Sequence, residues 1–80
     1  MGYHIAKIKK GILGDISKVQ EELDEFVDAK NQNCKIMEML ELSDLYGALE
    51  AVAKGYGLTM QDLKSMSDIT KRAFISGCRK

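Results

Sequence analysis

The stretch from Cys34 to Lys54 constrains the fold more than any other part of the sequence. It contains no proline, and its apolar residues occur on more than one side of a helical wheel. These apolar residues are Ile36, Met37, Met39, Leu40, Leu42, Leu45, Tyr46, Ala48, Leu49, Ala51 and Val52. A helix that is apolar around much of its circumference has to be buried between neighbours. The stretch therefore predicts a helix in the middle of a bundle.

The remaining composition also favours helices. The chain of 80 residues has no proline and no tryptophan, and it is rich in Leu, Met, Ala, Glu and Lys, which are good helix formers. We expect one all-α unit, with a basic N-terminal arm over residues 1–14 and a helical domain over residues 15–80. The arm lacks helical periodicity and contains Gly11 and Gly14, so we expect it to be irregular and to pack on another segment.

Two further helices are predicted on either side of the apolar stretch. The first begins near Asp15 or Ser17 and ends at a turn over residues 31–33. The third begins after Thr59, which forms an approximate capping box with Asp62. Three helices are too few for a closed four-helix bundle, and a core of this size is marginal alone. We therefore expect a bundle completed by homo-oligomerisation, as a dimer or a tetramer.

Several function classes are disfavoured by features that the sequence lacks. No apolar run approaches the length of a membrane span, and the N-terminus has no signal-peptide pattern, so we expect a cytoplasmic protein without a membrane partner. The two cysteines, Cys34 and Cys78, are too few for a disulfide framework. With a single histidine, we expect no zinc site built from thiolates or imidazoles. A net charge of zero and the lack of a helix-turn-helix pattern argue against a nucleic-acid partner.

The zero net charge hides a strong segregation of charge. Residues 1–20 hold four lysines against one aspartate, whereas residues 21–50 hold nine acids against two lysines. Residues 51–80 are basic again, with six Lys and Arg against two acids. A solvated acidic face on an ordinary helix is one interpretation. An acidic site flanked by basic segments, suited to a metal ion with an anionic ligand, is the other.

The spacing of the acids favours the second interpretation. Glu22 and Glu25 lie three residues apart on the first predicted helix, as Glu41 and Asp44 do on the second, so each pair shares a helix face. Antiparallel packing would bring the four carboxylates to one point. Glu41 falls among apolar positions, and a buried carboxylate needs a cation or hydrogen bonds. We therefore expect Glu22, Glu25, Glu41 and Asp44 to hold Mg²⁺, or alternatively Mn²⁺.

Other polar residues receive simpler interpretations. EExxE or ExxD alone occurs on many charged surface helices, so it is their pairing that indicates a site. We expect Asp28 and Glu50 to be solvated. His4 lies in the arm without a partner pattern, and we expect it to have a structural role.

These acidic motifs resemble those of the all-α nucleoside triphosphate pyrophosphohydrolases, the superfamily of MazG, phosphoribosyl-ATP pyrophosphohydrolases and dimeric dUTPases. Residues 21–25 (EELDE) match the first half of the family motif, and residues 41–50 (ELSDLYGALE) match its second helix. Lys18 matches a lysine that often precedes the motif. Residues 68–77 look like the tail of small, phage-type MazG-like proteins. The likeness covers about residues 15–77, although the chain is shorter than typical members and its arm replaces their first helix.

The resemblance implies an enzyme that cleaves a nucleoside triphosphate to the monophosphate and pyrophosphate with Mg²⁺. It implies a dimer or a dimer of dimers, in the host cytoplasm if the protein comes from a phage. We expect Glu21 to orient the attacking water or hold a further metal ion, and Lys18, Lys71 and Arg72 to neutralise phosphate charge. For Lys71 and Arg72, pairing with the helix dipole is an equal alternative. A non-catalytic, oligomeric interaction or regulatory module is the competing hypothesis.

Overall fold

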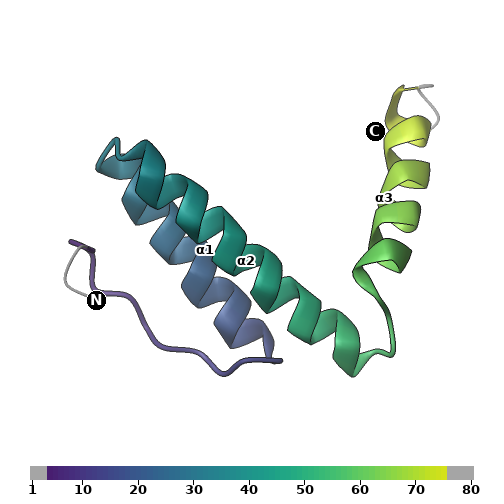
Figure 1. Ribbon diagram of the computed structural model, residues 1–80, viewed down its shortest axis with the longest axis horizontal. Coiled ribbons are helices and arrows are strands. Elements are labelled where there is room, and N and C mark those ends of the chain that lie inside the picture. The colour runs from purple at the N-terminus through teal and green to yellow at the C-terminus, as the bar shows by residue number, and fades with distance from the viewer. Residues whose placement is uncertain (1–3, 76–80) are drawn as a thin grey trace.

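The structure is a computed structural model that describes residues 4–75, apart from the side chain of Phe74, so Cys78 lies outside the described residues. This range contains three α-helices, α1 (Ile16–Asn31), α2 (Lys35–Gly55) and α3 (Met60–Ile75), and no strand (Figure 1). The expected all-α class is confirmed. No helix in the described range is long and apolar enough to cross a membrane.

Helices α1 and α2 form an antiparallel hairpin that makes up most of the packed structure (Figure 1). Asp15 caps the start of α1, because its carboxylate accepts a hydrogen bond from the Ser17 amide. The hairpin turn is made by Asn33, which adopts a positive φ of 56° and donates its amide to the Lys30 carbonyl. Asparagine tolerates this left-handed conformation at a helix end, which explains why the predicted turn falls where it does.

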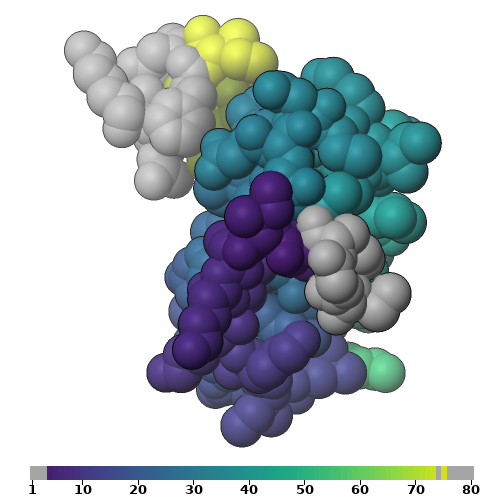
Figure 2. All heavy atoms as spheres, turned by 90° about the vertical axis from the view of Figure 1, so that its left-hand side faces the viewer, coloured from purple at the N-terminus to yellow at the C-terminus, as the bar shows by residue number. Residues whose placement is uncertain are grey.

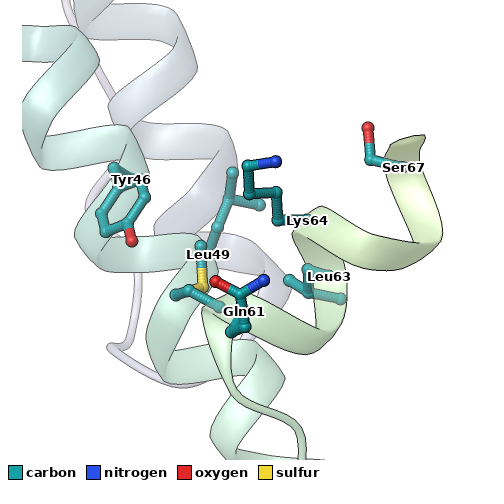
Figure 3. Close-up of a pocket in the computed structure, with 7 residues that line it drawn as sticks. Tyr46, Leu49, Gln61, Leu63, Lys64 and Ser67 are labelled. Carbon is teal, nitrogen blue, oxygen red and sulfur yellow. The ribbon is translucent and has the colours of Figure 1, made fainter. Parts of the chain in front are cut away.

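Helix α3 begins with the predicted capping box. The Thr59 hydroxyl accepts a hydrogen bond from the Asp62 amide, and the Asp62 carboxylate accepts one from the Thr59 amide. Beyond its first turns α3 leans away from the hairpin (Figure 1). A shallow cavity remains between α2 and α3, lined in part by Tyr46, Leu49 and Leu63 (Figure 3).

The arm packs along α1, as expected, and Figure 2 shows it lying against the surface of that helix. Gly11 makes a close approach to α1: a Cβ atom at this position would clash with the Ser17 carbonyl oxygen. Only glycine lets the backbone pass the start of α1 so closely. The Gly11 amide then donates a hydrogen bond to Glu21 Oε1 at 2.8 Å.

The interior of the single chain is polar rather than hydrophobic. Among the described residues, the buried apolar side chains are all alanines, namely Ala29, Ala48 and Ala53, and the largest fully buried side chain is Glu41. Large apolar residues of α2 remain exposed, including Met39, Leu42 and Tyr46. The hairpin therefore encloses charge and leaves much of its apolar surface uncovered.

Candidate metal centre

The hairpin brings together all five of the acids that we predicted for the site. Oxygens of Glu22, Glu41 and Asp44 lie within 4.8 Å of one another, and so do oxygens of Glu21, Glu22 and Glu25. Glu22 belongs to both groups and therefore links them. We call these five residues the acidic cluster. The pairing of two surface-like motifs on adjacent helices thus produces one concentrated site of negative charge.

The cluster is buried where α1 faces α2. Glu41 is 0% exposed and Glu22 is 5% exposed, whereas Asp44 lies at the exposed edge. Glu22 Oε2 forms an ion pair with Lys18 at 3.0 Å. Glu22 Oε1 is buried and accepts no hydrogen bond from any described residue. A buried carboxylate oxygen without a donor is costly, and this atom is therefore a candidate for a ligand of a cation.

Repulsion inside the cluster changes the protonation of Glu25. Burial, the negative charge of Glu22 and a hydrogen bond with Glu41 raise the pKa of Glu25 to about 7, against its ordinary 4.5. Like charges in a buried site disfavour ionisation of the second carboxyl group. Without a metal ion, Glu25 therefore keeps a proton below about pH 7, where an ordinary glutamate has already lost it.

The sequence interpretation was wrong for Asp28, which we expected to be solvated. Asp28 is only 6% exposed, and its carboxylate accepts hydrogen bonds from the amides of Ile5 and Ala6, both at 3.1 Å. His4 Nδ1 also donates to Asp28 Oδ2 at 2.9 Å. The bond from His4, together with those from the backbone, lowers the pKa of Asp28 to about 2. Asp28 therefore holds the arm against α1.

His4 reaches the acidic cluster through its other ring nitrogen. Its Nε2 lies 2.9 Å from Glu41 Oε2 and 3.8 Å from Glu25 Oε1. Burial alone would lower the pKa of His4, but Asp28 and Glu41 outweigh it and raise the pKa above 6.5. Sequence reasoning missed this contact because the arm has no periodicity that would place His4 over residues so distant in the chain.

Glu21 contacts the arm and two lysines. Besides the Gly11 amide, it forms ion pairs with Lys18 at 3.2 Å and with Lys10 at 3.5 Å. Burial would raise the pKa of Glu21, but the Gly11 amide and Lys18 lower it overall. Two lysines are thus held at the side of the cluster where α1 begins. Lys10 was not among the predicted site residues.

Lys71 and Arg72 do not join the acidic cluster of their own chain. Both are exposed on the second half of α3, which leans away from the hairpin (Figure 1). Arg72 Nε donates to the Asp68 carbonyl oxygen at 3.5 Å, which is a contact within α3. The structure therefore gathers Lys18 and the five acids, and leaves these two cations apart.

Comparison with known proteins adds nothing to this geometry: no family model, curated protein or solved structure matches the chain.

Proposed function

We propose that the protein is a metal-dependent hydrolase of nucleoside triphosphates that releases the monophosphate and pyrophosphate. Two observations together carry the proposal: oxygens of Glu22, Glu41 and Asp44 lie within 4.8 Å of one another, and the buried Glu22 Oε1 accepts no hydrogen bond from any described residue. The family resemblance of the two acidic motifs supplies the reaction type. The geometry supports it by joining those motifs in one site.

The acids fit a hard divalent cation. Mg²⁺ binds oxygens at about 2.0–2.1 Å, so oxygens around one ion lie roughly 3–4 Å apart. In the group of Glu22, Glu41 and Asp44, the carboxylate oxygens lie within 4.8 Å of one another. Small side-chain movements would bring these oxygens into that range. A bound Mg²⁺ would polarise phosphoryl oxygens and lower the pKa of a bound water. We propose Glu22, Glu25, Glu41 and Asp44 as its holders.

The basic residues beside the cluster suit a polyphosphate. Glu21 holds Lys10 and Lys18 at the edge of the acids, and both ammonium groups can turn toward an anionic ligand. Phosphoryl transfer depends mainly on positioning and charge stabilisation, which such lysines supply. We therefore propose that Glu21 positions these lysines, in place of its expected contact with the attacking water.

The proposed enzyme is a homo-oligomer, and the second copy covers the exposed face of α2. Met39, Leu42, Tyr46 and Leu49 recur at helical spacing and are all more than 40% exposed. The buried apolar side chains described in a single chain are three alanines, which cannot stabilise a hairpin with a charged interior. A second copy is the partner that supplies an equivalent apolar face at equal concentration.

The direct test is a panel of ribo- and deoxynucleoside triphosphates with Mg²⁺ or Mn²⁺, in which pyrophosphate and orthophosphate are measured separately. We expect pyrophosphate from at least one nucleotide. Glu41→Gln and Asp44→Asn should reduce the rate roughly 100-fold or more, because even outer partners of metal ligands contribute 10–100-fold.

The matched control is Glu50→Gln, which removes an exposed acid from the same helix and should retain the wild-type rate. Release of orthophosphate alone, or no hydrolysis of any nucleotide by a folded, metal-loaded protein, would contradict the proposal. The second result would favour a non-catalytic module.

A further inference from the structure

A third group of possible ligands lies on the arm side of the acidic cluster, and it includes a nitrogen. His4 Nε2 and oxygens of Glu25 and Glu41 lie within 4.8 Å of one another. Glu25 and Glu41 are also among the proposed holders of Mg²⁺, so two neighbouring cation positions would have these two carboxylates in common. Each of the three groups offers three side chains.

Asp28 fixes the orientation of the imidazole in this third group. It accepts the hydrogen bond from His4 Nδ1 at 2.9 Å, and two backbone amides of the arm hold the same carboxylate in place. Because Nδ1 is held as a donor, Nε2 is the ring atom that faces Glu25 and Glu41. A carboxylate behind a histidine is the usual support of a metal-binding imidazole.

Two further observations concern the surroundings of this group. Glu22 Oε1 is buried and has no donor among the described residues, and Glu22 shares one group of possible ligands with Glu25 and another with Glu41, the two acids of the His4 group. A cavity of about 200 Å³, lined in part by His4, Lys10 and Glu25, reaches the same side of the cluster. A cation needs both the negative charge of the acidic cluster and an opening from the solvent, which this cavity supplies.

We propose that His4, Glu25 and Glu41 form a mixed nitrogen–oxygen site that takes a transition-metal ion in preference to Mg²⁺. Imidazole is a good ligand for first-row transition metals, whereas Mg²⁺ prefers oxygen ligands and gives up its water reluctantly. The inference rests on the proposed metal centre, of which it is the second position, but it does not depend on catalysis.

The test uses Mn²⁺ as the probe, with equilibrium dialysis and pulsed electron paramagnetic resonance on the full chain. We expect two Mn²⁺ ions per chain and an electron spin-echo modulation from a directly bound imidazole nitrogen. This modulation should persist when Mg²⁺ is present in tenfold excess. His4→Gln should abolish it and leave one bound ion, whereas Lys9→Gln, which changes an exposed arm residue, should retain both features.

The outcomes separate this inference from the proposed function. Bound Mn²⁺ without nitrogen modulation in the wild-type protein would overturn the mixed site, even if hydrolysis continues at the carboxylate site. Nitrogen modulation in a protein that hydrolyses no nucleotide would support the mixed site and contradict the enzyme. No Mn²⁺ binding at all would overturn both. The wild-type measurement decides the question even if His4→Gln fails to fold.

Discussion

At the scale of single residues, two carboxyl groups with opposite pKa shifts give the stability of the metal-free protein a defined pH dependence. Asp28 has its pKa lowered from 3.8 to about 2, so its contribution is present above pH 4 and is lost as the pH falls. Glu25 has its pKa raised from 4.5 to about 7, so the folded chain binds an extra proton between these values. Stability therefore falls as the pH rises through that window. The raised pKa of His4 acts in the same direction above pH 6.5.

We predict that the melting temperature without metal is highest near pH 4–5 and decreases both toward pH 2 and toward pH 8. Glu25→Gln should flatten the decrease toward pH 8 and leave the acid side unchanged. Asp28→Asn should flatten the decrease toward pH 2 and should also weaken the part of the decrease toward pH 8 that comes from His4, because Asp28 helps to raise the pKa of His4. It should lower the melting temperature throughout, because asparagine replaces one of the two carboxylate oxygens that accept hydrogen bonds from the arm. Melting curves followed by circular dichroism at a series of pH values give the change of melting temperature with pH on both sides of the maximum. A wild-type melting temperature that rises steadily from pH 5 to pH 8 would contradict the assignment of Glu25.

The sequence predicted the acids of the site better than their partners. The i, i+3 spacing on two helices is a local pattern, and antiparallel packing turns it into the acidic cluster. The contacts of His4 with Asp28 and Glu41 join residues that are distant in the chain and follow no periodicity. Because the contact between His4 and Asp28 could not be predicted, Asp28 was expected to be solvated.

At the scale of elements, the arm depends on one glycine. Gly11→Ala would place a methyl group against the Ser17 carbonyl, so we predict that the arm separates from α1 around Glu21. Backbone amides of the arm should then lose protection in hydrogen exchange, while the hairpin amides retain theirs.

Gly47→Ala makes the same chemical change within α2, where nothing lies within 4 Å of the new methyl group. It should preserve the protection of the arm. Equal protection of the arm in Gly11→Ala and wild type would show that the close approach is not needed.

Helix boundaries were predictable because each has a local cause. Each boundary depends on residues only a few positions apart: the Asp15 cap, the turn at Asn33 and the Thr59–Asp62 capping box. The lean of α3 away from the hairpin had no such local signal in the sequence. Lys71 and Arg72, predicted from the sequence as substrate contacts, therefore lie away from their own cluster.

At the scale of the whole molecule, the exposed stripe of α2 should control assembly. We predict an oligomer at micromolar concentration in sedimentation or light-scattering measurements. Leu42→Glu should shift the population toward monomer and lower the melting temperature, because it places a charge in the apolar face. Lys35→Glu introduces the same residue at an exposed position near the start of α2 and should leave assembly unchanged. A stable, folded wild-type monomer would contradict the prediction.

In the proposed oligomer, Lys71 and Arg72 could contact the substrate in another copy. If they contact the substrate there, Lys71→Ala should raise KM and leave metal affinity intact. At substrate concentrations below the KM of Lys71→Ala, a mixture of Lys71→Ala and Glu41→Gln chains should be more active than either variant alone, since mixed oligomers contain one intact site. No recovery in mixed oligomers, together with a wild-type KM in Lys71→Ala, would exclude α3 as a phosphate contact. Lys10 and Lys18 would then remain as the phosphate-neutralising cations.

The central claim is that the acidic cluster is a metal centre, and a melting titration with Mn²⁺ tests it most directly. A cation that binds only the folded state at 100 times its Kd stabilises that state by about 2.7 kcal/mol. For a domain of this size, that corresponds to a rise of roughly 10 °C or more in melting temperature. We predict this rise for the wild type and for Glu50→Gln, and its loss in Glu41→Gln. A wild-type melting temperature that does not change with Mn²⁺, or a full rise in Glu41→Gln, would contradict the account.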